Sequence, residues 1–203
     1  MKKRFNKYKK EKKEYHRPRK TQGSAKHTNW EKKIHTRSEE ELFQFIKKIK
    51  GNPFFLILDQ VQDPHNLGAC LRSADGAGVH AVIIPKDNSV SITDVVRSIS
   101  CGAAESIPVF QVVNISRVIN KLQKAGLWIV GTTDKTEKTL YEIDLTGPLA
   151  IALGAEGKGL RQLTMKNCDF LCKIPMHGKV PCLNVSVATG ICLFEAARQR
   201  EIG

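Results

Sequence analysis

From residue 54 onwards, short apolar runs alternate with stretches whose apolar residues recur every three or four positions. The short runs are apolar throughout, which is typical of strands in a parallel sheet that is covered on both faces. The alternation predicts an α/β domain with a largely parallel sheet. The predicted strands are Phe54–Leu58, Ala81–Ile84, Ile107–Val112, Leu127–Gly131, Leu149–Leu153 and Phe170–Ile174, and the predicted helices are Leu67–Ala77, Asp94–Ser100, Ser116–Ala125, a short helix ending at Asn167, and Leu183–Arg200.

A further helix is predicted before the first strand. Ser38 is followed three residues later by a glutamate, the capping-box pattern in which the two side chains bind each other's backbone N–H groups. Gly51 is expected to end this helix, and Pro53 prevents it from continuing. The sequence therefore predicts an N-terminal helix and linker at 38–53, packed on a main domain at 54–203.

Two helices carry predictions about which side chains face the core. In the helix Asp94–Ser100, the inward residues are expected to be Val95, Val96 and Ile99. In the C-terminal helix, the residues that recur at helical spacing are Leu183, Val187, Ile191, Phe194 and Ala197. Asn184 and Ser186 stand at the start of that helix, where free N–H groups can meet a ligand or where Asn184 serves only as an N-cap.

The positive charge is concentrated at the N-terminus. The net charge is +13, of which residues 1–37 carry +12 and the other 166 residues carry +1. This segment has too few apolar residues to build a core and is predicted to be a disordered basic arm. Tyr8, Tyr15 and Trp30 lie among its charges, a combination that suits single-stranded or looped RNA. A tail that only keeps the protein soluble is the alternative.

Composition disfavours several classes of protein. No apolar run reaches the ~18–20 residues of a membrane span, and the lysine-rich start lacks the apolar segment of a secretory signal. The six cysteines show no CxxC pairing, which favours reduced thiols in a cytoplasmic protein over a zinc site. His65 and His177 are predicted to be surface residues, and no metal centre is expected.

Three polar loops follow predicted strands, and the carboxyl ends of strands are where ligands bind in open α/β sheets. The first loop carries Asn66 and Arg72, which are expected to flank the entrance of one helix. The second, Gly154–Gly159, lets backbone approach a ligand, but it lacks the spacing of a phosphate-binding or dinucleotide-binding loop. The third leads into Asn184. Taken singly, Arg72 could be a surface cation and Glu156 could cap the next helix.

Together the three loops resemble the motifs of the SpoU (TrmH-type) RNA ribose methyltransferases. The matching segments are Asp63-Pro-x-Asn66-x-Gly-Ala-x-x-Arg72-Ser-Ala, Leu153-Gly154-x-Glu156-Gly-x-Gly159 and Ile174-Pro-Met-x-Gly-x-x-x-x-Leu183-Asn184-Val-Ser-Val-Ala. They occur in family order, and the resemblance covers residues 54–200. It is strongest to the branch that methylates a guanosine 2′-hydroxyl in bacterial large-subunit ribosomal RNA. The resemblance implies a SPOUT-type fold with a deep C-terminal trefoil knot, S-adenosylmethionine as cofactor, and an obligate homodimer.

The resemblance also implies roles for individual residues. The implied catalytic residues are Arg72, Asn66, Glu156 and Asn184, and the implied cofactor contacts, largely through main-chain groups, are Gly154, Ile174, Leu183, Met176 and Thr132. No metal takes part. Arg72 either removes the proton of the ribose hydroxyl or stabilises the developing alkoxide, because a guanidinium is ordinarily never deprotonated.

Two features depart from the family pattern. Cys182 stands where the family usually has serine, and a thiol is a weaker hydrogen-bonding group than a hydroxyl. Members of the ribosomal branch usually carry a folded N-terminal RNA-binding domain, where this chain has the basic arm and one helix. Transfer RNA is therefore the alternative substrate. A non-catalytic RNA-binding protein with the same fold is the competing class, but retention of all four implied catalytic residues favours an enzyme.

Overall fold

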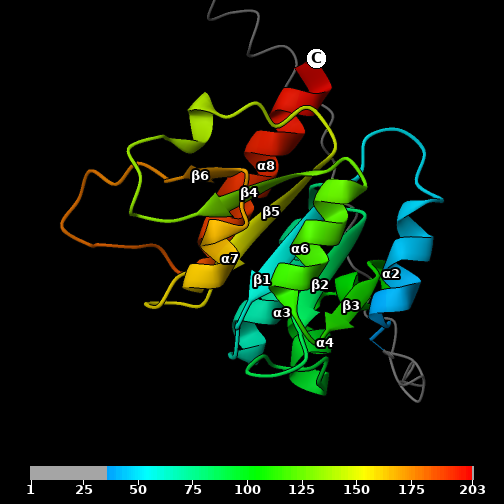
Figure 1. The fold of residues 1–203 in the computed structure, drawn as a ribbon. Helices are drawn as coiled ribbons and strands as arrows, with labels where there is room; N and C mark the ends of the chain where they lie inside the picture. Colours follow the sequence, from blue (N-terminus) through cyan, green and yellow to red (C-terminus); the bar gives the residue numbers. More distant parts are fainter. Residues whose placement is uncertain (1–35, 203) are drawn as a thin grey trace, which may run out of the picture. The chain divides into compact units, whose positions relative to one another are not determined.

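The computed structural model describes residues 36–202, so the predicted basic arm up to residue 35 lies outside the described part of the chain (Figure 1). Arg37 already belongs to the fold: its N–H donates to the Val109 carbonyl, and its carbonyl accepts from the N–H of Gln111, both at 2.9 Å. The described fold thus includes Arg37, which the prediction gave to the arm. No helix between residues 36 and 202 combines the length and apolar character needed to cross a bilayer.

Six parallel strands form one sheet in the order β3-β2-β1-β5-β4-β6. Every pairing between neighbouring strands is parallel. All six predicted strands are present with ends within two residues of the expected positions, which confirms the α/β prediction. Their bounds are β1 Phe54–Asp59, β2 Ala81–Pro85, β3 Val109–Val112, β4 Trp128–Thr132, β5 Leu149–Gly154 and β6 Phe170–Cys172.

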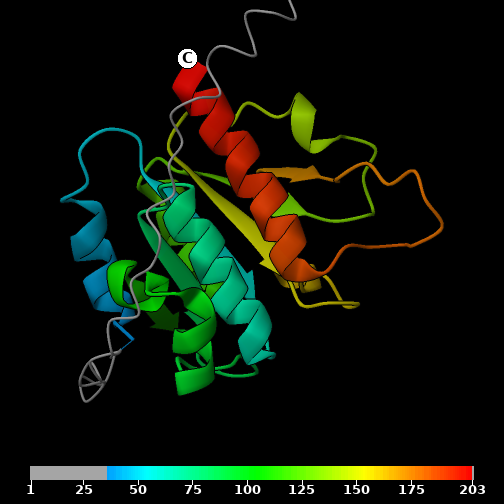
Figure 2. The ribbon, with the colours of Figure 1, turned by 180° about the vertical axis from the view of Figure 1, so that it is seen from behind.

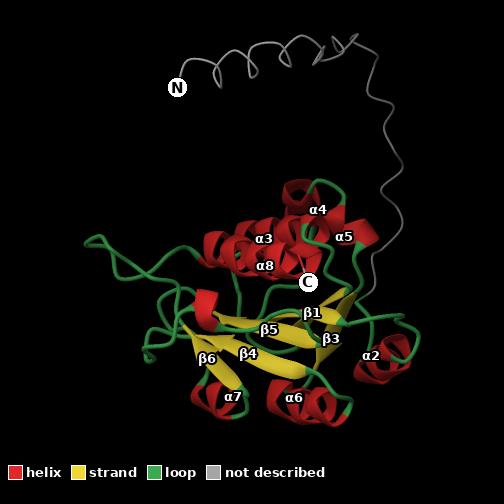
Figure 3. Cartoon of the chain, turned by 90° about the horizontal axis from the view of Figure 1, so that it is seen from above, coloured by secondary structure: helices red, strands yellow, loops and turns green. Residues whose placement is uncertain are grey.

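Helices cover both faces of this sheet (Figure 3). One face carries α3 (Pro64–Gly76), α4 (Asp94–Ser100), α5 (Ala103–Ser106) and α8 (Val185–Ile202). The other face carries α2 (Glu39–Ile46), α6 (Ile115–Lys124) and α7 (Gln162–Lys166). The 3₁₀ helix η2 (Leu140–Glu142) lies in the connection from β4 to β5, and neither it nor α5 was predicted, because each is a turn of four residues or fewer.

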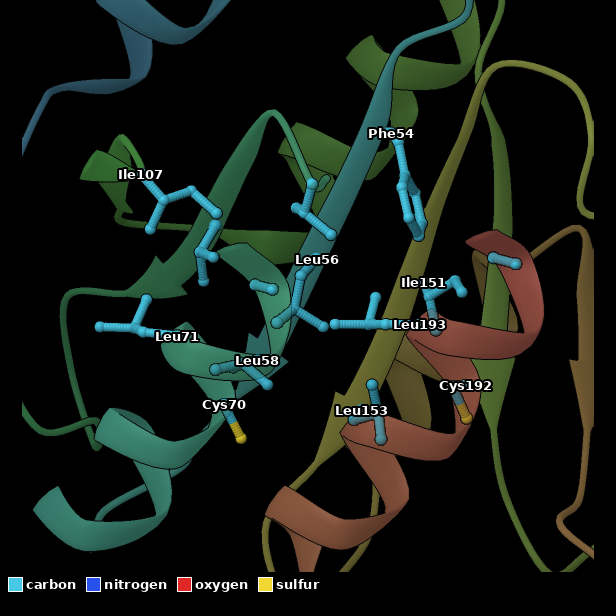
Figure 4. Packing of buried hydrophobic residues seen from close by; sticks show 14 of the residues in the cluster. Phe54, Leu56, Leu58, Cys70, Leu71, Ile107, Ile151, Leu153, Cys192 and Leu193 are labelled. Carbon is cyan, nitrogen blue, oxygen red and sulfur yellow. The ribbon is translucent and has the colours of Figure 1, made fainter. Parts of the chain in front are cut away.

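The core consists of two apolar clusters, one on each side of the sheet. Successive strand residues point to opposite faces, so Leu56 of β1 joins one cluster and Ile57 joins the other. Figure 4 shows Leu71 of α3 and Leu193 of α8 beside Leu56. Burial on both faces explains why the strands read as continuous apolar runs.

Two helices have a boundary that differs from the prediction by three residues or more. Helix α3 begins at Pro64, not Leu67, because Asp63 caps it by accepting the His65 N–H at 2.9 Å and proline suits the first helical position. Asn66 therefore lies in the first turn of a helix and not in a loop. Helix α2 has the predicted capping box at Ser38, but it ends at Ile46, before the left-handed Gly51.

The predicted buried faces of α4 and α8 are partly wrong. Val95 is exposed, whereas Val96 is buried. In α8, Val187 and Phe194 are 50% and 52% exposed. The residues that α8 buries instead are Val185, Thr189, Cys192, Leu193 and Ala196. Apolar residues occur on most sides of this helix, so their spacing in the sequence does not identify the face that packs on the sheet.

The end of α8 closes the amino ends of the central strands. Gln199 Oε1 accepts the Leu145 N–H at 2.8 Å, just before β5. The Arg200 guanidinium lies 4.5 Å from the ring centre of Phe54, and burial lowers its pKa. It donates to the carbonyls of Leu145 at 3.1 Å, Asn52 at 3.2 Å, Pro53 at 3.3 Å and Gly147 at 2.5 Å. One cation thus satisfies main-chain acceptors from two separate connections.

Candidate active site

A cavity of about 690 Å³ lies at the carboxyl ends of β4, β5 and β6. Its walls come from segments far apart in sequence, which meet there because parallel strands end at the same edge of a sheet. The five residues expected to contact a cofactor all line it: Thr132, Gly154, Ile174, Met176 and Leu183. Glu156 and Cys182 also line it, whereas Asn66, Arg72 and Asn184 do not.

Glycines form one wall of this cavity. A Cβ atom at Gly154 would lie 1.9 Å from the carbonyl carbon of Gly159, so no other residue fits there. Gly157 and Gly159 have φ angles of +74° and +66°, in the region that favours glycine. The Gly159 N–H donates to the Ala155 carbonyl at 2.8 Å, which closes the loop on itself. The result is a wall of bare main chain that a ligand can approach closely.

Sequence reasoning missed the carboxylate that anchors this loop. Asp59, at the end of β1, is fully buried, and its Oδ1 lies 2.7 Å from Nη2 of Arg161. Its Oδ2 accepts from Arg161 Nε at 3.1 Å and from Thr164 Oγ1 at 2.7 Å. Asp59 thereby ties β1 to the chain that follows the glycine loop. The available signal was an acidic residue ending an otherwise apolar strand, since a charge is buried only when it is paired.

Three of the four implied catalytic residues form one hydrogen-bonded cluster. Asn184 Nδ2 donates to Asn66 Oδ1 at 3.0 Å and lies 3.5 Å from Glu156 Oε2. Asn66 Nδ2 donates to the same Glu156 oxygen at 3.4 Å. The cluster thus joins the first turn of α3, the loop after β5 and the start of α8. It fixes a carboxylate at the rim of the cavity.

The alternatives for Asn184 and Glu156 are also decided by these contacts. Asn184 is indeed an N-cap, because its Oδ1 accepts from Ser186 N–H at 2.8 Å, yet its amide group binds Asn66 at the same time. Glu156 does not cap the next helix, because α7 begins after Arg161. Glu156 Oε1 has no hydrogen bond to any group between residues 36 and 202, so a ligand hydroxyl can use it.

Arg72 lies apart from this cluster within one chain. It is exposed on α3, roughly 9 Å along the helix and roughly 120° around it from Asn66. The expectation that both flank the helix entrance is wrong, because α3 runs from Pro64 to Gly76 and Arg72 lies in its third turn. In the described part of the chain its guanidinium forms no hydrogen bond or ion pair. Arg72 shares a face of α3 with Gly76, four residues on.

The six cysteines, all within the described residues, are free thiols. Burial raises the pKa of Cys70 and of Cys172 to about 11, so neither supplies a thiolate at neutral pH. Cys182 is exposed at the cavity. His65 and His177 are exposed, as predicted. Between residues 36 and 202 no three His, Cys, Asp or Glu side chains converge as a metal site would require.

The chain is similar to known proteins over the residues that form the described fold. The model of the SpoU rRNA Methylase family matches residues 53–194. The 23S rRNA (guanosine-2'-O-)-methyltransferase RlmB of Shewanella oneidensis is 64% identical over 163 residues, which are 80% of this chain and 66% of that protein. The protein of the same name from Escherichia coli K12 is 60% identical over 162 residues, again 80% of this chain and 66% of the relative. The chain thus spans less than two thirds of the length of these relatives.

Among solved structures, the chain is similar to the SpoU methyltransferase AviRb from Streptomyces viridochromogenes in complex with the cofactor AdoMet. The TM-score is 0.72 at 27% sequence identity. The match covers 80% of this chain and 65% of AviRb. The likeness therefore extends over nearly all of the described fold.

Proposed function

The chain belongs to the SpoU rRNA Methylase family, and from that membership we propose that it methylates a ribose 2′-hydroxyl of RNA with S-adenosylmethionine as methyl donor. The substrate we propose is a guanosine in 23S ribosomal RNA, the activity named for relatives at 64% and 60% identity. The observation that carries the proposal is the position of Glu156, which lines the cavity and also binds Asn66 and Asn184. A cofactor site and a group that can orient a hydroxyl thus meet at one residue.

The cavity fits S-adenosylmethionine in size and chemistry. Its volume of about 690 Å³ lies within the roughly 300–1,000 Å³ of small-molecule sites. Leu153 and Leu160 offer apolar surface for a purine, and Asp134 and Lys135 offer charges for the amino-acid end. When bound, the cofactor supplies an electrophilic methyl group on a sulfonium. The residues that would hold it are Gly154, Ile174, Leu183, Met176 and Thr132.

In the proposed mechanism the residues of this chain align the reacting hydroxyl. Asn66 and Asn184 hold the Glu156 carboxylate, whose second oxygen accepts a hydrogen bond from the ribose. Alignment of this kind lowers a barrier by as much as ~7–11 kcal/mol. Arg72 then either takes the hydroxyl proton or stabilises the oxygen as it becomes negative. Neither step requires a metal ion.

The position of Arg72 supports a homodimer as part of the proposal. Figure 2 shows α3 and α8 side by side, and a Cβ atom at Gly76 would lie 3.5 Å from the ring of Phe194. Arg72 therefore borders the exposed apolar face that Val187 and Phe194 form on α8. Pairing two copies across this face would bury it and would bring the partner's Arg72 towards the cluster. Light scattering is expected to give a molar mass twice the chain mass of 22.7 kDa. The mass of a monomer at micromolar protein concentration would contradict the proposed dimer.

The C-terminal trefoil knot is also proposed. The connection between β4 and β5 lies against β6 and its continuation, since the N–H of Leu140 donates to the Lys173 carbonyl at 2.9 Å. Gln199 of α8 binds the same connection a few residues later. It donates to the Ile143 carbonyl and accepts the Leu145 N–H. The C-terminal segment thus meets this connection twice, as a threaded chain would. Tracing residues 131–202 in an experimental electron-density map would test the path.

The basic arm is proposed to bind RNA phosphates in a cytoplasmic enzyme. If it neutralises six to eight phosphates, the logarithm of affinity should fall with the logarithm of salt concentration at a slope of about −4 to −7. A deletion should end at residue 35, because Arg37 pairs with β3. We expect the shortened chain to show a flatter slope and an unchanged affinity for S-adenosylmethionine. An identical slope would leave the arm as a solubilising tail.

Two measurements test the proposed activity. Calorimetry without RNA should detect binding of S-adenosylmethionine, and no heat at millimolar cofactor would remove the cofactor site. Transfer of labelled methyl groups should then occur to unmodified 23S ribosomal RNA and not to transfer RNA. The reverse preference would identify a transfer-RNA enzyme. Cofactor binding without transfer to either RNA, or RNA binding alone, would favour the non-catalytic class.

A further inference from the structure

Two aromatic side chains lie exposed in contact with each other at the edge of the sheet. Trp128 is 54% exposed and Phe170 is 37% exposed, and their ring centres are 5.5 Å apart with 45° between the ring planes. Nζ of Lys138 lies 5.6 Å from the centre of the Phe170 ring. A single exposed apolar residue is ordinary, but two touching rings with a cation over one of them form an organised surface.

The strands explain why this surface is held in place. Phe170 pairs with Val130 across β6 and β4, and Trp128 is two residues earlier in β4, so both rings stand on the same face of the sheet. β6 is the edge strand. The backbone of both residues is therefore held by strand pairing, which places the two side chains next to each other.

The charges around the rings favour an anionic partner. Lys138 supplies a cation at the surface itself. The acids nearest along the chain are engaged elsewhere. Asp169, beside Phe170, accepts from the Ile129 N–H at 2.7 Å and from Gln123 at 3.0 Å. Glu137, beside Lys138, pairs with Lys173 at 2.8 Å, and Glu142 accepts the Thr139 N–H at 2.7 Å. Aromatic rings beside a lysine are the combination that stacks an unpaired base and holds its phosphate.

The surface is also within reach of the candidate active site. Strand β6 begins at Phe170 and ends at Cys172, and the next residue, Lys173, lines the cavity. Three residues of extended chain span roughly 10 Å. Stacked nucleotides of one strand are about 3.4 Å apart, so an RNA strand covers this distance within a few nucleotides.

We propose that Trp128, Phe170 and Lys138 bind an unpaired base of the RNA, a few nucleotides from the ribose that is methylated. This inference rests on the proposed function for its substrate class. It adds a second contact, outside the cavity and the catalytic cluster. The bound base stacks on the indole and phenyl rings, and the ammonium group binds the adjoining phosphate.

Fluorescence of Trp128 tests this inference without any methyl transfer. The chain has two tryptophans, so the full-length Trp30→Phe variant leaves Trp128 as the single reporter. We expect an eight-nucleotide oligoadenylate to quench its emission and a duplex of the same length to leave it unchanged, because stacking requires an unpaired base. Absence of quenching by the single strand would overturn the inference.

Substitutions separate stacking from mere apolar contact. Trp128→Leu should weaken binding of the single strand by roughly 5- to 100-fold, the loss expected for one base stack. Trp128→Phe keeps a ring and should retain most of the affinity. Lys138→Gln should also reduce affinity and lower the salt slope by about one phosphate contact, by ~0.7. Lys124→Gln, an exposed lysine on α6, is the matched control and should change neither.

The remaining outcomes each decide the question. Equal affinity of Trp128→Leu and the wild type would overturn the inference. A change in Trp128 emission with protein concentration alone would also overturn the inference, because a second copy of the chain would then occupy the surface. Quenching by RNA in a protein that transfers no methyl group would refute the proposed function and leave this RNA site standing.

Discussion

The two ends of the sheet satisfy their polar groups in opposite ways. At the amino ends, Arg200 and Gln199 of α8 bind main-chain groups of the neighbouring connections, so the protein supplies its own partners. At the carboxyl ends, a glycine wall and a cluster of two amides and a carboxylate border a cavity of about 690 Å³. The first end is closed by side chains, and the second leaves main chain and one carboxylate oxygen for a ligand.

This difference predicts which substitutions affect stability and which affect activity. Removing a side chain at the closed end leaves buried carbonyls without partners, which costs folding free energy. Removing an exposed group that serves only the reaction leaves folding unchanged. The predictions below test that separation, beginning with the largest effect.

Arg72→Ala should reduce methyl transfer by about a thousandfold while leaving the unfolding midpoint and cofactor affinity unchanged. The reason is that Arg72 is exposed and makes no hydrogen bond between residues 36 and 202, yet it is the implied group that handles the hydroxyl proton. Arg72→Lys should not restore activity, because a lysine lacks the planar fork of a guanidinium. Turnover like that of the wild type in either variant would exclude Arg72 from the reaction.

Asp59→Asn should destabilise the fold by about 1.5–3 kcal/mol, because the buried carboxylate loses its charged hydrogen bonds from Arg161, whose own side chain is 42% exposed and stays solvated. It should also weaken cofactor binding, since Asp59 anchors the chain that follows the glycine loop. Urea unfolding and calorimetry measure the two effects. Glu137→Gln, at the exposed ion pair with Lys173, is the control and should leave the urea midpoint in place. Equal midpoints for both variants would show that Asp59 anchors nothing.

Arg200→Ala should destabilise the protein by about 1.5–3 kcal/mol, the contribution of hydrogen bonds from a charged group. Cofactor affinity should not change, because Arg200 lies at the opposite end of the sheet from the cavity. Arg198→Ala removes a neighbouring arginine that bonds Glu195 alone among residues 36–202, and it should have little effect. A weaker cofactor site in Arg200→Ala would show that the two ends of the sheet are coupled.

The smallest effect concerns Glu39, which lies on α2, away from both ends. Burial opposes its ionisation, but hydrogen bonds from Lys121 and Arg117 outweigh burial and hold its pKa below the ordinary 4.5. The ionised carboxylate therefore stabilises the fold above pH 4.5, and this contribution is lost as the pH falls through the lower folded-state pKa. Urea midpoints at pH 6 and pH 3.5 should differ less in Glu39→Gln than in the wild type. An equal difference in both would mean that Glu39 carries no such linkage.

The sequence predicted the sheet well because strands buried on both faces are apolar at every position. It did not predict which face of α8 is buried, because that helix is apolar nearly all round. Trp128, inside a correctly predicted strand, is exposed because the short edge strand β6 begins opposite Val130, two residues further along β4, and strand order is a property of the whole fold. The sequence motifs predicted a shared site for Asn66, Glu156 and Asn184, and hydrogen bonds connect the three side chains in the structure. Asp59 escaped notice because its partner Arg161 is 102 residues away.

The most direct test of the proposed activity is mass mapping of ribose methylation in RNA from cells that lack this chain. We expect one guanosine of 23S ribosomal RNA to lose its 2′-O-methyl group, to regain it when the wild-type chain is restored, and to remain unmodified when Arg72→Ala is supplied. An unchanged methylation pattern in ribosomal RNA, with or without a loss in transfer RNA, would contradict the proposed function.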